Sequence, residues 1–361
     1  MPIVFFVILG LYLAGNFYIY FKGIHVLAAF PVGIKVGVSL LFWFFTLALL
    51  FTFLLRKSNV SLKLLTFLHE AGSVWLVFSL YMVLFLLFFD LLRCIYKPFS
   101  LGFYGAFGLT LCLLLYGYYN YKHPEIREYT ITVKKSMPVS SLKIVAVSDV
   151  HLGLGTGKRA LTGYIDRINV QRPDIILISG DLIDNSVLPL KQERMEEELN
   201  RLSAPLGVYM VPGNHEYIAE IEECVDFIRS TQIQLLRDSV VSLENGLQLI
   251  GRDDRSNHCR KTLSELLKKT VPEKPMILLD HQPYNLDRTV SAGVDLQFSG
   301  HTHRGQIWPL SWLTDRLFEL SYGYERRGET SLYVSSGLSL WGPPFRIGTD
   351  SELVVFNLIF Q

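Results

Sequence analysis

Charged residues are scarce in this chain. They make up 19% of its 361 residues, whereas a soluble domain has about 25%. Half of the residues are hydrophobic, which excludes a disordered chain. The chain has four cysteines and no C-x-x-C pair, which excludes a disulfide scaffold and a zinc ribbon. A net charge of +1 provides no strong basic field, so we expect no nucleic-acid partner.

The shortage of charge is confined to the first third of the chain. Residues 1–121 hold seven basic and two acidic residues, a net charge of +5. The remaining 240 residues hold 27 basic and 31 acidic residues, a net charge of −4. The chain is therefore expected to consist of two domains, residues 1–121 and residues 122–361, with different surroundings.

Apolar runs account for the missing charge. A bilayer-spanning helix needs about 20 mostly apolar residues. Four stretches without a charged residue approach or meet this length, and they predict a four-helix transmembrane anchor: Ile3–Phe21, Val36–Leu55, Ser73–Phe89 and Leu101–Tyr121. The first is not preceded by basic residues or followed by a small-x-small site, so we expect it to be an uncleaved helix of a multi-pass protein in the cell membrane.

The distribution of basic residues predicts the orientation. Four spans place both termini on one side of the membrane, and basic loops favour the cytoplasm. The loop at Arg56–Lys63 and the tail after the fourth span carry seven basic residues, against four in the opposing loops. This favours a cytoplasmic C-terminal domain, and the prediction reverses if Gly23–Lys35 re-enters or spans the membrane.

After residue 121 the pattern changes to short apolar strands that alternate with helices. Tyr129–Val133 is expected to be the first strand, and helical patterns lie near Lys158–Gln171, Leu190–Leu202 and Glu216–Ser230. Five further apolar runs are each followed within three residues by Asp, Asn or His. They are Lys143–Ser148, Ile175–Ser179, Val208–Val211, Met276–Leu279 and Val294–Ser299. This order predicts an α/β domain with its chemistry at the carboxyl ends of the strands.

The residues at these strand ends form a set of metal ligands. Isolated Asp and His side chains at buried strand tips need a partner, and shared metal ions supply one. The set is Asp149, His151, Asp181, Asn214, His281, His301 and His303. Mixed nitrogen and oxygen donors suit Mn, Fe or Zn, and seven ligands exceed a single tetrahedral site. Two divalent ions about 3.5–4 Å apart would stabilise phosphoryl transfer and turn a bridging water into hydroxide.

The ordered motifs D-x-H, G-D-x-x-D, G-N-H-E, H-x-P and G-H-x-H resemble those of the calcineurin-like metallophosphoesterases, over about residues 142–358. The resemblance implies a four-layer α/β/β/α sandwich. It also implies that Asp149, His151 and His303 bind one metal, that Asn214, His281 and His301 bind the other, and that Asp181 bridges both. His215 would be catalytic, acting on the leaving oxygen or on the developing charge.

Four further residues are expected near this site. Asp184 and Glu216 would orient imidazoles, although a turn aspartate and a first-turn helix acid are equally ordinary interpretations. Arg252 and Arg304 are candidates for binding a substrate phosphate, and the alternative is that both are solvated loop residues. Arg304 also departs from the pattern of the membrane-associated bacterial phosphodiesterases described below, which usually have Gly-Gly after the last histidine.

The C-terminal motifs suggest which branch is related. Residues 299–306, 332–337 and 341–346 look like those of membrane-associated bacterial phosphodiesterases, which include secreted Bacillus-type enzymes and UDP-2,3-diacylglucosamine pyrophosphatases. The run Ile307–Phe318 has two Trp and several aliphatic residues, so it is expected to be an amphipathic segment on the bilayer or a wall of the pocket. We therefore expect hydrolysis of a phosphodiester or pyrophosphate, with a lipid-linked phosphoester as the candidate substrate.

Three other functions compete with this one. A phosphomonoesterase or protein phosphatase would use the same metal core. A transporter or sensor with a phosphoesterase output domain would explain the membrane part, although no charge inside the predicted spans supports a transport path. A non-enzymatic binding platform is disfavoured because every ligand of the motif set is present.

Overall fold

A computed structural model describes residues 2–55, 58, 60–96 and 102–361. The chain divides into two compact units. The first comprises Met1–Tyr119 with Gly342–Phe345, and the second comprises Asn120–Trp341 with Arg346–Gln361. Each unit has its own interior, and they are described separately.

The first unit is helical. Its helices are α1 (Pro2–Val26), α2 (Val32–Leu55), α3 (Leu62–Ile95) and α4 (Gly102–Lys122), and the last of these runs on into the second unit. In the described residues, three of them (α1 to α3) are long and apolar enough to cross a membrane. All four predicted segments are helical over their described residues, Leu101 of the fourth lying outside them, but α4 is not among the three because tyrosines, glycines and Asn120 lower its hydropathy.

A polar network joins the first three helices. Nε1 of Trp75 on α3 donates to Oδ1 of Asn16 on α1 at 2.9 Å and to Oγ1 of Thr46 on α2 at 3.0 Å. A Cβ on Gly72 would lie 2.4 Å from the backbone nitrogen of Leu49, so α2 and α3 approach closely there. Small residues at close contacts and polar side chains shared between helices are how apolar helices associate in lipid, where burial alone gives little preference.

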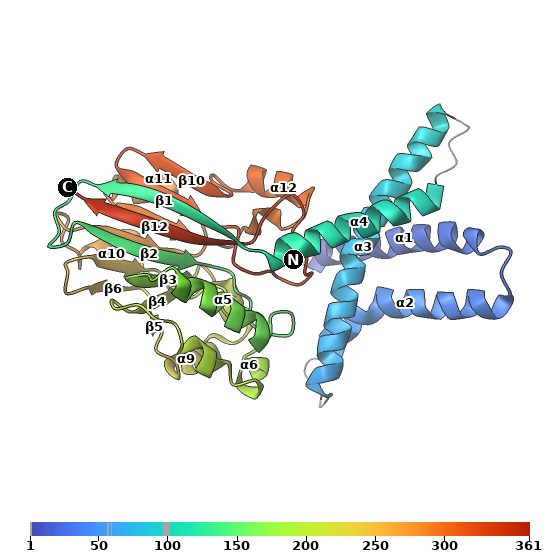
Figure 1. The fold of residues 1–361 in the computed structure, drawn as a ribbon, viewed down its shortest axis with the longest axis horizontal. Coiled ribbons are helices and arrows are strands. Elements are labelled where there is room, and N and C mark those ends of the chain that lie inside the picture. The colour runs from blue at the N-terminus through green and yellow to red at the C-terminus, as the bar shows by residue number, and fades with distance from the viewer. Residues whose placement is uncertain (1, 56–57, 59, 97–101) are drawn as a thin grey trace. The chain divides into compact units, whose positions relative to one another are not determined.

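The second unit is built on two mixed six-stranded sheets (Figure 1). The first runs in the order β1 (Glu125–Val133), β12 (Glu352–Phe360), β2 (Ser141–Val147), β3 (Ile175–Ser179), β4 (Val208–Val211), β5 (Gln234–Leu235). The second runs in the order β10 (Gly323–Arg327), β11 (Thr330–Val334), β9 (Leu296–Ser299), β8 (Met276–Leu279), β7 (Gln248–Gly251), β6 (Ser239–Ser242). The pairs β12–β2, β10–β11 and β6–β7 are antiparallel, and the remaining pairs are parallel.

Side chains that alternate along the strands form the layers. Ile144 and Ala146 of β2 face one cluster together with Leu249 and Ile277 of the second sheet, so this cluster lies between the sheets. The intervening Val145 faces a second cluster with α5 (Lys158–Val170), α7 (Met195–Leu199) and α9 (Ile221–Arg229). On the outer face of the second sheet, residues of β7 and β8 pack against α10 (Leu263–Leu267). These four layers confirm the predicted sandwich.

Two of the predicted helices are interrupted. The pattern at Leu190–Leu202 forms α6 (Leu188–Gln192) and α7, because Arg194 between them is left-handed with φ 53°. The pattern at Glu216–Ser230 forms α8 (Asn214–Ile218) and α9, because Glu220 has φ 70°. A single continuous helix was the wrong prediction in both places, since periodicity of apolar residues does not register one left-handed residue.

Candidate metal centre

The loops that follow five strands meet at one place in the second unit. Asp149 and His151 follow β2, Asp181 follows β3, Asn214 follows β4, His281 follows β8, and His301 and His303 follow β9. Six of these seven residues, together with His215, fall into three groups whose ligand atoms lie within 4.8 Å of one another. The central strands of both sheets therefore contribute to one cluster.

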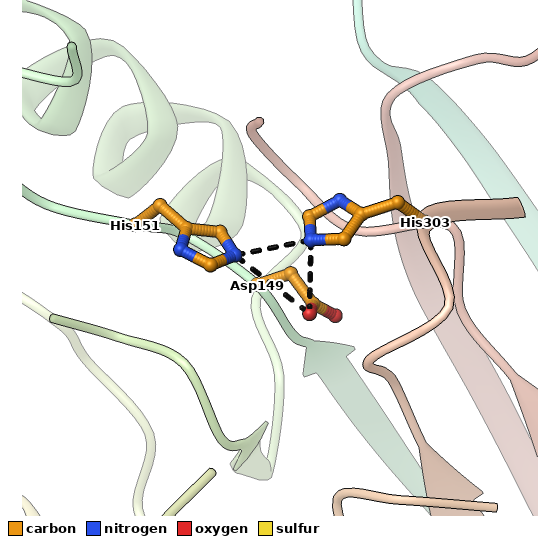
Figure 2. A group of neighbouring side chains, drawn as sticks. All are labelled: Asp149, His151 and His303. Atoms are coloured by element: carbon orange, nitrogen blue, oxygen red, sulfur yellow. Dashed lines mark hydrogen bonds and ion pairs between the residues drawn. The ribbon is translucent and has the colours of Figure 1, made fainter. Parts of the chain in front are cut away.

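The first group consists of Asp149, His151 and His303, whose donor atoms point toward a common centre (Figure 2). Nε2 of His151 lies 3.0 Å from Nε2 of His303. Oδ1 of Asp149 lies 3.3 Å from Nε2 of His303 and 3.9 Å from Nε2 of His151. Two imidazole nitrogens and a carboxylate oxygen directed at one point are a suitable donor set for Mn, Fe or Zn.

The second group consists of Asp181, His281 and His301. Oδ2 of Asp181 lies 3.2 Å from Nε2 of His281 and 3.8 Å from Nε2 of His151. Asp181 also forms the third group, with His151 and His215. The carboxylate of Asp181 is therefore shared between residues of the first and second groups.

Hydrogen bonds fix which ring nitrogen of His281 faces the cluster. Its Nδ1 bonds to the backbone oxygen of Ser179 at 2.7 Å, so a neutral ring has its proton there and its lone pair on Nε2. In the described part of the chain, this buried Nε2 and the buried Oδ1 of Asn214 have no hydrogen-bond partner. Buried polar atoms are rarely left unpaired, and a cation would satisfy both atoms. The residues present thus fit divalent metal ions.

The protonation states also favour a cation. Burial lowers the pKa of His301 to about 4, with a contribution from the charge on His281. Burial and the charge on His151 lower the pKa of His303 well below its ordinary value. Burial acts the same way on His281, but the carboxylates of Asp181 and Asp149 outweigh it and raise its pKa. His301 and His303 are therefore neutral near pH 7, with a lone pair to offer.

The backbone around the cluster is strained. Five of the seven candidate ligands have a positive φ, namely Asp149 at 54°, His151 at 48°, Asp181 at 52°, His301 at 74° and His303 at 48°. Each such conformation costs about 1–3 kcal/mol in a residue other than glycine. Strain of this kind persists only when the surroundings hold it, and it is typical of functional sites.

Glycines make room for the ligands. A Cβ on Gly213 would lie 2.2 Å from Oδ1 of Asp181, and one on Gly300 would lie 2.2 Å from Oδ2 of Asp149. A Cβ on Gly180 would lie 2.4 Å from Nδ1 of His281. Each of these glycines directly precedes a candidate ligand, which explains why the motifs contain Gly-Asp, Gly-Asn and Gly-His pairs.

His215 lies beside the cluster and is held by Asp184. Its Nδ1 lies 3.0 Å from Oδ1 of Asp184, and its backbone amide donates to Oδ1 of Asp181 at 2.9 Å. Burial lowers the pKa of His215, but the hydrogen bond and the charges of both aspartates outweigh this and raise it to about 9. Oδ1 of Asp184 also lies 3.4 Å from Nδ1 of His151. Asp184 thus contacts two imidazoles.

Glu216 binds backbone amides. Its Oε2 accepts from Gly213 at 2.7 Å and from Asp181 at 3.0 Å, and its Oε1 accepts from Ile183 at 2.9 Å. Glu216 is fully buried, and its bond to the Gly213 amide caps the start of α8. Among these contacts none is to an imidazole, so Glu216 joins the loop after β3 to the loop after β4.

The two arginines proposed for substrate lie in different settings. Nη1 of Arg252 pairs with Oδ2 of Asp280 at 2.8 Å, one residue before His281. Arg304 has its guanidinium carbon 4.7 Å from the centre of the Tyr322 ring. It belongs to the short helix η1 (His303–Gly305), directly after a candidate ligand.

Sequence reasoning gave no role to Arg346. Its side chain is fully buried, and Nη1 donates to the backbone oxygen of His303 at 3.0 Å. Nη2 donates to the backbone oxygens of Ser336 at 2.5 Å and Ser339 at 2.7 Å. Arg346 therefore fixes the loop that carries His303. The only signal was an arginine after Gly-Pro-Pro-Phe, and that local pattern does not reveal burial.

An apolar helix lies next to the cluster. The ring of His301 lies 5.8 Å from the ring of Phe318, which ends α12 (Leu310–Leu317). Trp312 is 63% exposed, and Leu313 and Leu317 are similarly exposed. Of the two interpretations given to this segment, exposure of its large apolar side chains favours a surface that meets another apolar phase.

Comparison with known proteins agrees with this geometry. Residues 142–305 match the family model for calcineurin-like phosphoesterases. An uncharacterized metallophosphoesterase of Helicobacter pylori is 35% identical over 262 residues, which cover 70% of each chain. The chain belongs to the calcineurin-like phosphoesterase family. It is a metallophosphoesterase, a hydrolase of phosphoric esters, and enzymes of its family use divalent metals.

Other relatives of this metallophosphoesterase are matched over different shares of their own length. An uncharacterized metallophosphoesterase of Aquifex aeolicus is 31% identical and covers 66% of this chain and 95% of its own. A zebrafish (Danio rerio) protein named as a transmembrane protein with a metallophosphoesterase domain is 31% identical and covers 71% of this chain and 62% of its own. Together with three helices apolar enough to cross a bilayer, the second relative indicates a membrane protein.

Proposed function

We propose that this metallophosphoesterase uses two divalent ions to hydrolyse phosphodiester or pyrophosphate bonds of a lipid-bearing substrate. The observation that carries the two-ion assignment is the position of Asp181. Its Oδ2 lies 3.2 Å from Nε2 of His281 and 3.8 Å from Nε2 of His151, which belong to different groups. A carboxylate shared in this way is what a two-ion site requires.

The assignment of ligands follows the groups. Asp149, His151 and His303 would hold one ion, and Asn214, His281 and His301 the other, with Asp181 between them. When bound, such ions activate water as the nucleophile and neutralise charge on the phosphoryl oxygens. Mn, Fe and Zn all suit this mixed donor set.

His215 would move the proton. Its Nδ1 is held by Asp184 at 3.0 Å, which leaves Nε2 as the ring nitrogen for substrate. A pKa raised to about 9 keeps the ring protonated at neutral pH. A protonated imidazole beside the phosphate would donate to the leaving oxygen or stabilise its developing charge.

The lipid part of the proposal rests on the apolar side chains near the site. Trp312, Leu313 and Leu317 are exposed on α12, and Phe318 at its end contacts His301. Helices long enough to cross a bilayer belong to the same chain. A substrate with an acyl chain would place its apolar part on α12 while its phosphoester reaches the cluster.

A substrate comparison tests this function. Full-length protein in detergent is loaded with Mn, Fe or Zn, and turnover is measured on a phosphodiester lipid, a UDP-linked lipid and a phosphomonoester. We expect kcat/KM to be highest for one of the two lipid substrates. The Asp181→Ala protein serves as the control for contaminating phosphatases. Preferred hydrolysis of the monoester would contradict the diester assignment, and equal rates on short-chain and long-chain diesters would contradict the lipid assignment.

A further inference from the structure

A cavity lies in the second unit, apart from the metal centre. Its volume is about 340 Å³, within the range of small-ligand pockets. The loop that follows β7 and the start of α11 (Leu286–Ser291) form most of its wall. Five of the lining residues are basic, namely Arg252, Arg255, Arg260, Lys261 and Arg288.

The positive charge of this basic cavity is only partly neutralised. Asp280 pairs with Arg252 at 2.8 Å and with Arg260 at 3.2 Å, so one carboxylate serves two guanidinium groups. In the part of the chain that the structure describes, the side chains of the other three basic residues, Arg255, Lys261 and Arg288, form no ion pair.

Two nearby carboxylates pair with arginines outside the cavity. Asp253 pairs with Arg237 at 3.2 Å, and Asp287 pairs with Arg327 at 3.0 Å. These two acids therefore do not neutralise the basic residues of the cavity wall. Five clustered cations with one paired carboxylate among them form a candidate anion site, and guanidinium groups match the geometry of phosphate oxygens.

Aromatic rings connect the basic cavity to the metal centre. The guanidinium carbon of Arg255 lies 4.1 Å from the centre of the Tyr284 ring, a stacking contact that orients the fork. The Tyr284 ring lies 5.3 Å from the Phe318 ring, and that ring lies 5.8 Å from His301. Two contacting rings therefore separate the cavity from His301.

We propose that the basic cavity binds a second phosphate group of the substrate, several bonds away from the phosphoester that is cleaved. This inference rests on the proposed hydrolase function and narrows it to substrates with at least two phosphates. Arg255 and Arg288 bind the remote phosphate, and Arg252 acts together with Asp280 to hold the wall in place. The single cleaved phosphate stays at the metal centre.

Binding is tested first, without catalysis. Full-length protein carrying Asp181→Ala is titrated with inorganic pyrophosphate by calorimetry, so that the metal centre does not compete. We expect saturable binding that weakens at least ten-fold when Arg255→Ala and Arg288→Ala are added. Arg229→Ala, an exposed arginine outside the cavity, is the matched control and leaves the affinity unchanged. If pyrophosphate does not bind the Asp181→Ala protein, or binds it equally well after Arg255→Ala and Arg288→Ala are added, the proposal is overturned.

Kinetics then separate a substrate site from a site for a free anion. Thymidine 5′-(p-nitrophenyl phosphate) is compared with the same compound bearing a 3′-phosphate. The added phosphate should lower KM in the unmodified protein, and a double variant with Arg255→Ala and Arg288→Ala that keeps Asp181 should lose at least ten-fold of that KM advantage while kcat changes little. An unchanged ratio of KM values in the double variant, despite weaker pyrophosphate binding, overturns the assignment to substrate.

Failure of the hydrolase function gives a different result. If neither nucleotide is cleaved under any metal loading, the proposed function is wrong, and the calorimetric result on the basic cavity is unaffected. If both nucleotides are cleaved and pyrophosphate does not bind the parent cavity, the cavity proposal alone is wrong.

Discussion

Nε2 of His281 lies 3.2 Å from Oδ2 of Asp181, while Nδ1 of the same ring is bonded to the backbone oxygen of Ser179. Asp181 and Asp149 raise the pKa of His281, so in the absence of metal the ring holds a proton on Nε2 and pairs with Asp181, and a divalent cation between the two would take the place of that proton. Both residues are therefore needed to hold a cation at this position.

Asp181→Ala should empty both metal positions. The carboxylate is shared between the two groups of ligands, so its loss removes a donor from each and leaves His281 facing a void. Metal analysis of the purified variant after reconstitution should find less than one ion per chain. Asp226→Ala removes an exposed acid elsewhere and should leave the metal content as it was. Two ions per chain in Asp181→Ala would show that Asp181 does not bridge.

His215→Ala should keep its metal and lose turnover. The ring belongs to the cluster with His151 and Asp181, but its Nδ1 is committed to Asp184. Removal of a positioned general acid costs about 10²–10⁴ in rate. The measurement is kcat on bis-p-nitrophenyl phosphate at equal metal occupancy. A rate within a factor of three of the parent would remove His215 from the proposed mechanism.

Asp184→Asn should move the basic limb of the pH–rate profile to lower pH. The Asp184 carboxylate raises the pKa of His215, so its replacement by an amide leaves the imidazolium less stable and the ring loses its proton earlier. A neighbouring opposite charge is worth about one to three pH units. Activity of the variant should therefore fall at a pH lower by about that amount. A profile with the same limb but reduced height would indicate a purely structural role for Asp184.

Gly213→Ala should disrupt the metal centre, whereas Gly163→Ala should not. A Cβ on Gly213 would lie 2.2 Å from Oδ1 of Asp181 and 2.8 Å from Cδ2 of His281, and overpacking of this kind costs about 1–3 kcal/mol. Gly163 lies within α5 with nothing within 4 Å, so alanine there should stabilise the helix by about 0.5–1 kcal/mol. Thermal unfolding with and without metal checks both. Normal metal binding by Gly213→Ala would show that the loops can separate.

The strand ends could be predicted because the chain encodes them locally. Strands β3, β4 and β8 coincide with the predicted runs Ile175–Ser179, Val208–Val211 and Met276–Leu279. Each run is buried on both faces, so it is continuous in apolar residues and stops where the polar loop begins.

Long-range pairing was not accessible in the same way. Strand β12 inserts between β1 and β2, parallel to the first and antiparallel to the second, and no local pattern specifies either neighbour. The contacts of Arg346 with His303, and of Asp280 with Arg252 and Arg260, likewise join residues that are far apart in the sequence. For this reason the loops with the candidate ligands and the nearby Glu216 could be predicted from the sequence, whereas Arg346, which fixes the loop that carries His303, could not.

The membrane face of the second unit can be determined through Cys259, which is exposed and lies between β7 and α10, whereas Cys224 is buried. The sequence predicts a cytoplasmic C-terminal domain, because with four spans the loops on that side carry seven basic residues and the opposing loops carry four. A chain that crosses only with α1 to α3 would instead place its two ends on opposite sides. A membrane-impermeant maleimide is added to right-side-out vesicles that contain the parent protein or Cys259→Ser. Because a cytoplasmic domain is enclosed in such vesicles, the parent should label no more than Cys259→Ser until detergent is added. Labelling that depends on Cys259 in sealed vesicles would place the catalytic unit outside.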